Sequence, residues 1–418
     1  MVMAMTMLPS RRFLAPLAAA AFLVGPAVPT ATAATGLTFR VTTTADQIDA
    51  RPGDGVCRTA AGTCSLRAAM IEADFHPTQR TTIQMPAGHF TITRGPLLPI
   101  VNASPSLAGP FMVLSNVTVR GAGARQTVID GNGLDRIFTV APPWVTLDLS
   151  DVTLTGGIAR ERELVVVTGG GAIANQGHLV LHRVTVQGNR ADYGGGIFNT
   201  PSARAEIYDS SILDNIANRE GGGIRFDAAG TLVNSTVARN RVLASCCPGG
   251  SFDGSLVGEG GGIDTRGAGP VTIISSTIVD NHAATGGGGL NAATGYQGNP
   301  GGLLPAIGGK VTVRNTVIAR NTSDSGAANC KHTVAPLVSL GHNLEDASSC
   351  PFTAVGDVRG TDPQLVGPAD FGGPTDTYLP AQTSPLLAAA TAGPAYDQRG
   401  VPRPASCTIG AVEGSSPI

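Results

Sequence analysis

Two short segments bring arginine and aspartate together at a spacing that suits ligand binding or acid–base chemistry. Arg225 and Asp227 stand two residues apart, and so do Asp264 and Arg266. Each segment follows a run of three glycines and an isoleucine, so aligning the two runs places Arg225 near Asp264 and Asp227 near Arg266. Strand side chains alternate, so all four point outward if the aligned isoleucines point inward. They could form a polar sugar-binding face and supply catalytic groups, or form two exposed ion pairs, each worth about 0–1 kcal/mol.

Metal and cofactor sites have weaker support in the sequence. Asp46, Asp49 and Asp54 cluster in one segment and could hold Ca²⁺, but they follow no recognisable calcium-loop pattern. The alternative is that they are solvated aspartates in turns. The seven histidines show no ligand-like spacing, and no Cys-x-x-Cys motif occurs. We therefore predict no cofactor, with calcium as the one ion that the sequence could accommodate.

Composition restricts the class of protein. Glycine accounts for 56 of 418 residues, aromatic residues for only 4%, and the net charge is −2. Lys310 and Lys331 are the only lysines, so the basic surface typical of nucleic-acid binding is absent. Residues 1–33 resemble a signal peptide, with Arg11 and Arg12 before a short apolar run and an Ala-Thr-Ala cleavage site. No later stretch is long and apolar enough to span a membrane, so we expect a secreted or surface-associated protein.

An internal repeat positions the candidate residues. Glycine runs ending in a hydrophobic residue recur, and these hydrophobic residues, from Ile173 to Leu290, are 24, 27, 39 and 27 residues apart. Between the runs lie short β-branched strands followed by asparagine, as in Val184–Asn189 and Thr277–Asn281. A unit of about 25 residues cannot bury its apolar side alone, but stacked units share a continuous core. We therefore predict an all-β right-handed parallel β-helix, with asparagines stacked at one turn and glycines at positive φ.

The regions flanking the repeat indicate caps and loops. Ser65–Ala73 predicts a short amphipathic capping helix with Ser65 as its N-cap, followed by a first strand at Thr82–Met85. Inserts at 241–259 and 292–309 interrupt the period and are expected to project as loops on a binding side. From about residue 361 the repeat dissolves into a tail that we expect to fold over the last coils. The predicted organisation is a signal peptide at 1–33, a cap module at 34–80, coils at 81–330 and a C-terminal capping region at 331–418.

Seven cysteines in an exported chain favour disulfide bonds. Cys57 and Cys64 bracket one short loop, and Cys330 and Cys350 bracket another, so we expect two local bridges. The other three cysteines, of which one should stay unpaired, are Cys246, Cys247 and Cys407.

The two ends carry a more specific resemblance. Gly53–Cys57 and Cys64-Ser65-Leu66-Arg67 resemble the N-terminal Cys-Ser-Leu-Arg-Glu-Ala (CSLREA) module of bacterial surface β-helix proteins, with Ala68 in place of the glutamate. Segments of the tail are similar to the C-terminal region known as choice-of-anchor Q, namely Asp362-Pro363, Gly372–Thr375, Ser384-Pro385, Asp397–Gly400, Arg403-Pro404 and Ile409–Ala411. The resemblance implies a bacterial extracellular or cell-surface protein with a fold like that of pectate lyases, but no single reaction.

Sequence motifs for catalysis are missing. Asn-Thr-Asp, Asp-Asp, Gly-His-Gly and Arg-Ile-Lys, which polygalacturonase-type hydrolases carry, do not occur, and His89, His178 and His342 each lack that context. Arg399 and Arg403 superficially resemble a lyase arginine motif, but we interpret them as structural residues of the tail. We expect a monomeric, non-catalytic protein that binds an extracellular polysaccharide or a cell-surface component. The alternative is a polysaccharide lyase or glycoside hydrolase, so the sequence leaves open whether the protein is an enzyme.

Overall fold

The computed structural model describes residues 36–95, 107–159, 169–243, 258–267, 269–293, 309–324, 328–332, 336–391 and 393–415. The predicted signal peptide, Cys246, Cys247 and most of the two predicted inserts lie outside these ranges. No helix among the described residues is long and apolar enough to cross a membrane.

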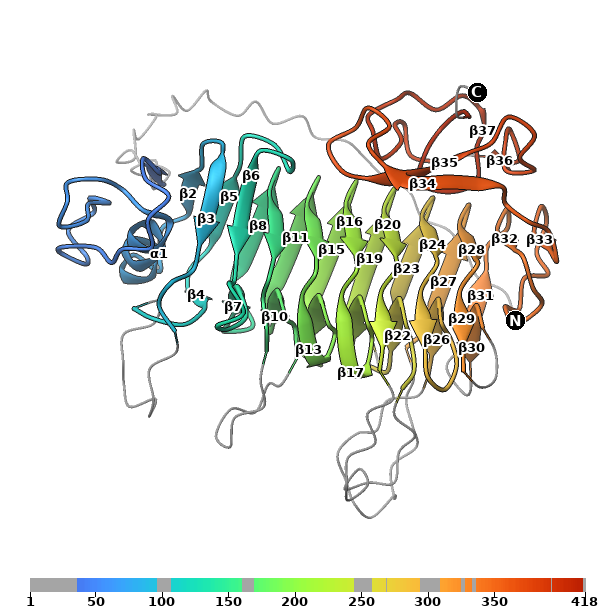
Figure 1. The fold of residues 1–418 in the computed structure, drawn as a ribbon, viewed down its shortest axis with the longest axis horizontal. Helices are drawn as coiled ribbons and strands as arrows, with labels where there is room; N and C mark the ends of the chain where they lie inside the picture. Colours follow the sequence, from blue (N-terminus) through green and yellow to red (C-terminus); the bar gives the residue numbers. More distant parts are fainter. Residues whose placement is uncertain are drawn as a thin grey trace, which may run out of the picture. The chain divides into compact units, whose positions relative to one another are not determined.

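Within the described ranges, the chain forms four parallel sheets, here named A to D (Figure 1). Sheet A contains, in spatial order, β1 (Leu37–Arg40), β2 (Thr81–Gln84), β5 (Val117–Arg120), β8 (Thr146–Ser150), β11 (His178–His182), β15 (Arg204–Tyr208), β19 (Ala229–Val233), β23 (Val271–Ile274), β27 (Val311–Arg314) and β31 (Leu337–Ser339). Sheet B contains β3 (Gly88–Thr91), β6 (Thr127–Asp130), β9 (Thr153–Thr155), β12 (Thr185–Gln187), β16 (Ser211–Leu213), β20 (Thr236–Ala238), β24 (Thr277–Val279), β28 (Val317–Ala319), β32 (Leu344–Glu345) and β33 (Val358–Arg359).

The other two parallel sheets complete each coil. Sheet C contains β4 (Phe111–Val113), β7 (Phe138–Val140), β10 (Ile173–Asn175), β14 (Ile197–Asn199), β18 (Ile224–Phe226), β22 (Ile263–Thr265), β26 (Leu290–Ala292) and β30 (Cys330–His332). Sheet D contains β13 (Arg190–Tyr193), β17 (Ile216–Glu220), β21 (Arg241–Val242), β25 (His282–Ala283) and β29 (Thr322–Ser323). In the coil formed by β15, β16, β17 and β18, the chain visits sheets A, B, D and C in turn, and the next coil pairs in parallel with it. This arrangement is the predicted right-handed parallel β-helix.

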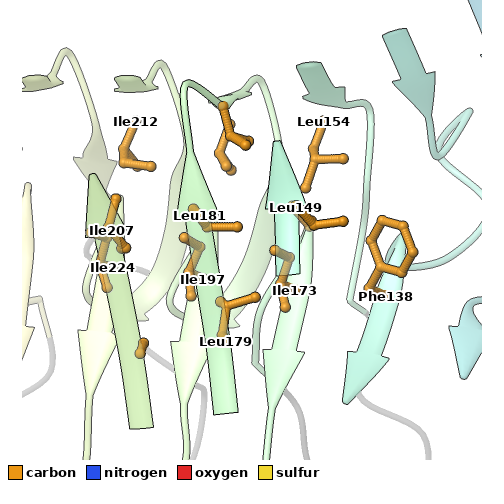
Figure 2. Packing of buried hydrophobic residues seen from close by; sticks show 14 of the residues in the cluster. Phe138, Leu149, Leu154, Ile173, Leu179, Leu181, Ile197, Ile207, Ile212 and Ile224 are labelled. Carbon is orange, nitrogen blue, oxygen red and sulfur yellow. The ribbon is translucent and has the colours of Figure 1, made fainter. Parts of the chain in front are cut away.

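The core forms from the inward residues of sheets A, B and C. Leu181 and Ile207 are neighbours in sheet A, Ile197 and Ile224 in sheet C, and Ile212 belongs to sheet B (Figure 2). All five side chains are fully buried. Because parallel strands lie about 4.8 Å apart, each apolar side chain packs directly on its counterpart in the next coil. The alternating apolar residues of the repeat therefore account for one continuous core.

The predicted asparagine stack is present at the turn between sheets B and D. Asn189, Asn215, Asn240, Asn281 and Asn321 are buried, and each of the first four donates its side-chain N–H to the side-chain oxygen of the next, at 2.9–3.0 Å. The left-handed backbone expected at these residues lies one position earlier, at Gly188, Asp214, Arg239, Asp280 and Arg320, with φ from 55° to 64°. The asparagine itself is needed for hydrogen bonding along the stack rather than for its backbone freedom.

The glycine runs have the predicted conformation. Gly221 has a φ of +66°, a backbone conformation that residues with a side chain rarely adopt. At Gly222, an added Cβ would lie 2.2 Å from the carbonyl oxygen of Gly261 in the next coil. The first position of this run thus requires the conformational freedom of glycine, and the second requires the absence of a side chain.

The N-terminal end is capped by the predicted helix, here α1 (Leu66–Phe75). Ser65 caps it by accepting a hydrogen bond from the backbone N–H of Ala68 at 3.0 Å, and the Cys57–Cys64 disulfide precedes it. The prediction that the first strand is at 82–85 was wrong, because β1 already pairs with β2 in sheet A. A strand from before the helix therefore belongs to the first coil.

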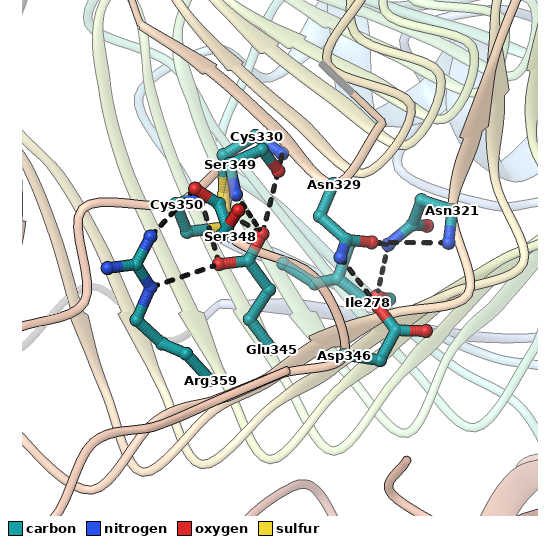
Figure 3. The surroundings of a disulfide bond; sticks show 10 residues. All are labelled: Ile278, Asn321, Asn329, Cys330, Glu345, Asp346, Ser348, Ser349, Cys350 and Arg359. Carbon is teal, nitrogen blue, oxygen red and sulfur yellow. Dashed lines mark hydrogen bonds and ion pairs between the residues drawn. A yellow bond between two sulfur atoms is a disulfide. The ribbon is translucent and has the colours of Figure 1, made fainter. Parts of the chain in front are cut away.

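A disulfide and a buried glutamate close the opposite end (Figure 3). Glu345 is paired with Ile318 in sheet B, where earlier coils place an apolar residue inward. Its carboxylate accepts hydrogen bonds from the backbone N–H groups of Ser349 at 2.6 Å and Cys350 at 2.9 Å. Cys350 forms the predicted disulfide with Cys330 of β30. The backbone of the loop thereby satisfies the buried carboxylate.

The tail lies along sheet B, over coils that include the last ones. It contains two antiparallel pairs, β34 (Leu365–Ala369) with β35 (Thr377–Pro380), and β36 (Ala390–Thr391) with β37 (Ser406–Cys407). The buried Gln398 side chain donates to Ser211 Oγ at 2.9 Å and accepts from Thr236 Oγ1 at 2.7 Å, in β16 and β20. Outward hydroxyls of sheet B thus provide part of the docking surface, and the hydrogen bond from His342 Nδ1 to the Ala389 carbonyl oxygen, at 2.9 Å, shows that the tail also reaches the last coils, as expected. Cys407 lies buried in this tail and forms no disulfide with another cysteine of the described ranges.

Candidate functional site

The candidate site lies on the outer face of sheet C. Ile224 and Ile263 point into the core, so the residue after each points outward. Strand register aligns these outward residues over four consecutive coils, in the order Arg225, Asp264, Asn291 and Lys331. The predicted alignment of Arg225 with Asp264 is therefore confirmed.

Arg225 joins two carboxylates of its own coil. Its Nη1 contacts Glu220 Oε2, and its Nε donates to Asp227 Oδ1 at 2.8 Å. Only 14% of the Arg225 side chain is exposed. Partial burial strengthens both contacts, because less water competes for the guanidinium.

Arg266 lies one coil later, at the position aligned with Asp227, and connects the two coils. Its Nη2 lies 2.8 Å from Glu220 Oε1 and 2.6 Å from Glu259 Oε2. Its Nε donates to Asp264 Oδ2 at 3.2 Å. Glu220 and Glu259 are themselves neighbours in a parallel bridge, which explains how one guanidinium reaches both.

Asn291 and Lys331 extend the network through the next two coils. The Asn291 side-chain N–H group donates to Asp264 Oδ1 at 2.7 Å and to Glu259 Oε2 at 3.0 Å. Lys331 Nζ contacts Glu259 Oε1. Within the described part of the chain, the buried Oδ1 of Asn291 has no hydrogen-bond partner. We name the connected set the sheet C cluster; it comprises Glu220, Arg225, Asp227, Glu259, Asp264, Arg266, Asn291 and Lys331.

Two aromatic rings border this cluster on the preceding coil. Tyr193 and Phe198 have ring centroids 6.3 Å apart. The Arg225 guanidinium carbon lies 4.5 Å from the Tyr193 centroid and 5.5 Å from the Phe198 centroid. Cation–π attraction holds the guanidinium against the rings, so this end of the cluster combines aromatic surface with charge.

The charge balance of the cluster favours one bound proton. Four carboxylates face three cations, which leaves a net charge of −1 when all are ionised. Burial raises the pKa of Glu220 to about 7; Arg225 and Arg266 oppose this rise, whereas Asp264 and Glu259 add to it. Glu220 is therefore the carboxyl group that exchanges its proton near neutral pH.

No family model and no curated protein matches this chain. Among solved structures, the chain is similar to the crystal structure of pectate lyase Pel9A, with 15% sequence identity and a TM-score of 0.43. The similarity covers 91% of this chain and 97% of that chain. Identity this low says nothing about shared activity.

The structure corrects the predicted ion pairs of the four candidate residues. Arg225 bonds Asp227, and Arg266 bonds Asp264, so each pair forms within a coil rather than between coils. Residues two apart in a strand share a face, and the arginine side chain is long enough to span that interval. The pairs are also not exposed, since the Asp264 side chain is fully buried.

Sequence reasoning missed the glutamates that connect the two pairs. Glu220 and Glu259 each directly precede a glycine run, four residues before the aligned isoleucine. Extending the alignment backwards across the glycines would have placed them together. Lys331 could have been found only by recognising that Cys330 continues the inward row of sheet C.

The remaining predicted residues have structural partners. Asp46 contacts the Arg67 side chain, Asp49 accepts from the backbone N–H of Arg58 at 2.8 Å, and Asp54 accepts from that of Val56 at 2.9 Å. Among the described residues, no group of three or more His, Cys, Asp or Glu residues could hold a metal ion.

Two tail arginines have the structural role that we inferred for them. Arg399 bonds Asp397 at 2.9 Å, and Arg403 donates to the backbone oxygens of Thr408 and Gly410 at 3.1 and 2.8 Å. Their contacts thus hold the tail together.

Proposed function

We propose that this is a secreted or surface-associated, monomeric β-helix protein that binds an extracellular polysaccharide through the outer face of sheet C without cleaving it. The observation that carries the proposal is the row from Arg225 to Lys331, which runs over four consecutive coils beside two aromatic rings. Its accessible groups are the side chains of Arg225, 14% exposed, and Lys331, 22% exposed, whereas the fully buried Asp264 and Asn291 belong to the network that holds them. Sugars offer hydroxyl groups to polar side chains and apolar ring faces to aromatic ones, so this combination suits a glycan.

The internal bonding of the cluster favours binding over catalysis. Both carboxylate oxygens of Glu220 are held by arginines, and those of Glu259 by Lys331, Arg266 and Asn291. A catalytic base must reach a substrate proton, which such saturated carboxylates do poorly. A rigid, satisfied network instead lowers the entropy lost when a ligand binds.

Other features agree with an extracellular location. The two disulfides are compatible with an oxidising compartment. The resemblance of the N-terminal segment to the CSLREA module, and of the tail to choice-of-anchor Q regions, supports a bacterial cell-surface role. We propose no nucleic-acid partner, because the net charge is −2 and the chain has only two lysines.

One observation favours a second candidate, a glycoside hydrolase. Glu220, with its pKa raised to about 7, lies beside Glu259, and a proton-bearing carboxyl group near a second carboxylate is the pair that glycoside hydrolysis uses. A polysaccharide lyase is the other enzymatic alternative, and such an enzyme would use calcium to neutralise a uronate carboxylate.

The deciding experiment screens the purified protein against uronate-containing and neutral polysaccharides, with and without calcium. Binding is followed by calorimetry, lyase products by their ultraviolet absorbance, and hydrolase products by reducing ends. We expect binding to at least one polysaccharide and no product in either channel. Absorbing product would establish a lyase, reducing ends alone would establish a hydrolase, and absence of binding to every polysaccharide would contradict the proposal.

A further inference from the structure

In the coil of β7 and β8, the corner between sheets C and A forms a longer protrusion than in the coil that follows. Val140 is paired with Asn175, and Thr146 with His178, so the same corner is spanned twice in register. The corner contains five residues, 141–145, between β7 and β8, but only two residues, 176–177, between β10 and β11. The longer corner, between β7 and β8, includes Pro142, Pro143 and Trp144.

This protrusion displays an indole to solvent from a fixed base. Trp144 is 79% exposed and is the sole tryptophan of the sequence. Beside it, Val145 is buried, and its carbonyl oxygen accepts from the backbone N–H of His178 at 2.8 Å. Two prolines further restrict the backbone. The backbone that carries the ring is therefore restricted, while the ring itself is largely exposed.

The same corner leads to the sheet C cluster. Successive coils place Gln176, Thr200, Asp227 and Arg266 after their sheet C strands, and hydrogen bonds such as that from Asn175 Nδ2 to Asn199 Oδ1, at 2.7 Å, connect these coils. At the usual strand spacing, Asp227 is three coils and roughly 14 Å from the coil of Trp144, and Arg266 is four coils and roughly 19 Å away. A short oligosaccharide lying along the coils covers that length.

We propose that Trp144 stacks against a sugar ring of the polysaccharide and forms the far end of the binding face. This inference rests on the proposed function. An exposed indole on a restricted backbone offers a flat apolar surface to the C–H groups of a sugar, while Gln176 offers an amide to its hydroxyls. The ligand class is thus an extended glycan that spans several coils rather than a single sugar.

Because Trp144 is the only tryptophan, its fluorescence reports on this position alone. Titration with the polysaccharide that the screen selects should shift its emission to shorter wavelength. Calorimetry should show about tenfold weaker binding for Trp144→Ala and near-normal binding for Trp144→Phe, which keeps an aromatic face. Shortening the ligand to a disaccharide should abolish the difference between the wild type and Trp144→Ala.

The matched control is Tyr396→Ala, which removes another exposed aromatic ring, in the tail, and should leave the affinity unchanged. Unchanged emission together with equal affinity for Trp144→Ala would overturn the inference while leaving the proposed function intact. An emission shift with phosphatidylcholine–phosphatidylglycerol vesicles but not with glycan would also overturn it, in favour of a membrane contact. If no polysaccharide binds at all, the proposed function fails and the inference fails with it.

Discussion

Glu220 lies between the guanidinium groups of Arg225 and Arg266, yet burial raises its pKa from the ordinary 4.5 to about 7. In the unfolded chain the carboxyl group loses its proton first, so between these two values the folded state binds more protons. The free energy of unfolding therefore decreases as the pH rises from about 4.5 to about 7. Above that range, Glu220 adds no further pH dependence.

The measurement is urea unfolding at a series of pH values, comparing the wild type with Glu220→Gln. Glutamine keeps the shape but stays neutral, so the variant should lose part of the decrease. Glu206→Gln is a suitable control: burial raises the Glu206 pKa, but hydrogen bonds from Tyr208 and His178 and the charge of Arg204 outweigh it and lower the pKa. It should keep the decrease, and equal slopes for the wild type and Glu220→Gln would contradict the account.

For the site residues, the sequence predicts which positions lie side by side better than it predicts which side chains bond to one another. The repeat alignment placed Arg225 and Asp264 side by side correctly, because strand register follows the repeat. It did not predict that Glu220 would join them, because residues across a glycine corner approach only when the corner folds back. Side-chain pairing depends on such local turns, which alignment of the strands alone does not specify.

Among the elements, the glycine corner before β18 is the most sensitive to a small change. A Cβ at Gly222 would lie 2.2 Å from the Gly261 oxygen and 2.8 Å from backbone atoms of Arg241. No flexible side chain is available to move, so the coils would have to separate. We expect Gly222→Ala to lower the free energy of unfolding by about 3 kcal/mol or more, or to prevent folding.

Gly95→Ala provides the control for that substitution. A Cβ at Gly95 meets nothing within 4 Å, so its effect should be about 0.5 kcal/mol or less. Urea unfolding and expression of the soluble protein measure both variants. Equal stability of Gly222→Ala and Gly95→Ala would show that the coils are not packed through this glycine.

The sequence also indicated that the turn after sheet B needs a stacked asparagine and a left-handed residue, but it did not show that these are two different residues. The asparagine stack from Asn189 to Asn321 was predicted, because one polar residue type recurs at one phase. The left-handed residue is the one before, and in Arg239 and Arg320 it is not even a residue type that favours this conformation. The hydrogen bonds of the stack outweigh that local preference.

For the whole molecule, the architecture follows from the repeat, whereas the course of the tail does not. Each coil packs only against the coils on either side of it, so the position of one coil predicts that of the next. The tail instead docks through single contacts distant in sequence, such as Gln398 with Ser211 and Thr236. No periodicity marks these partners, so only the folded structure shows that the tail lies along sheet B.

We propose that the outer face of sheet C binds a glycan, and calorimetry of three variants with the polysaccharide that the screen selects tests this proposal. Arg225→Ala and Lys331→Ala each remove one cation of the cluster; Lys331, 22% exposed, has a single carboxylate partner, Glu259, in the described structure and is the safer change for folding. Arg239→Ala removes an exposed arginine paired with Asp214 at the turn after sheet B.

With folding verified by circular dichroism, we expect both cluster variants to bind about tenfold more weakly or worse, and Arg239→Ala to bind like the wild type. Wild-type affinity in both cluster variants would contradict the account and place the binding surface elsewhere on the molecule.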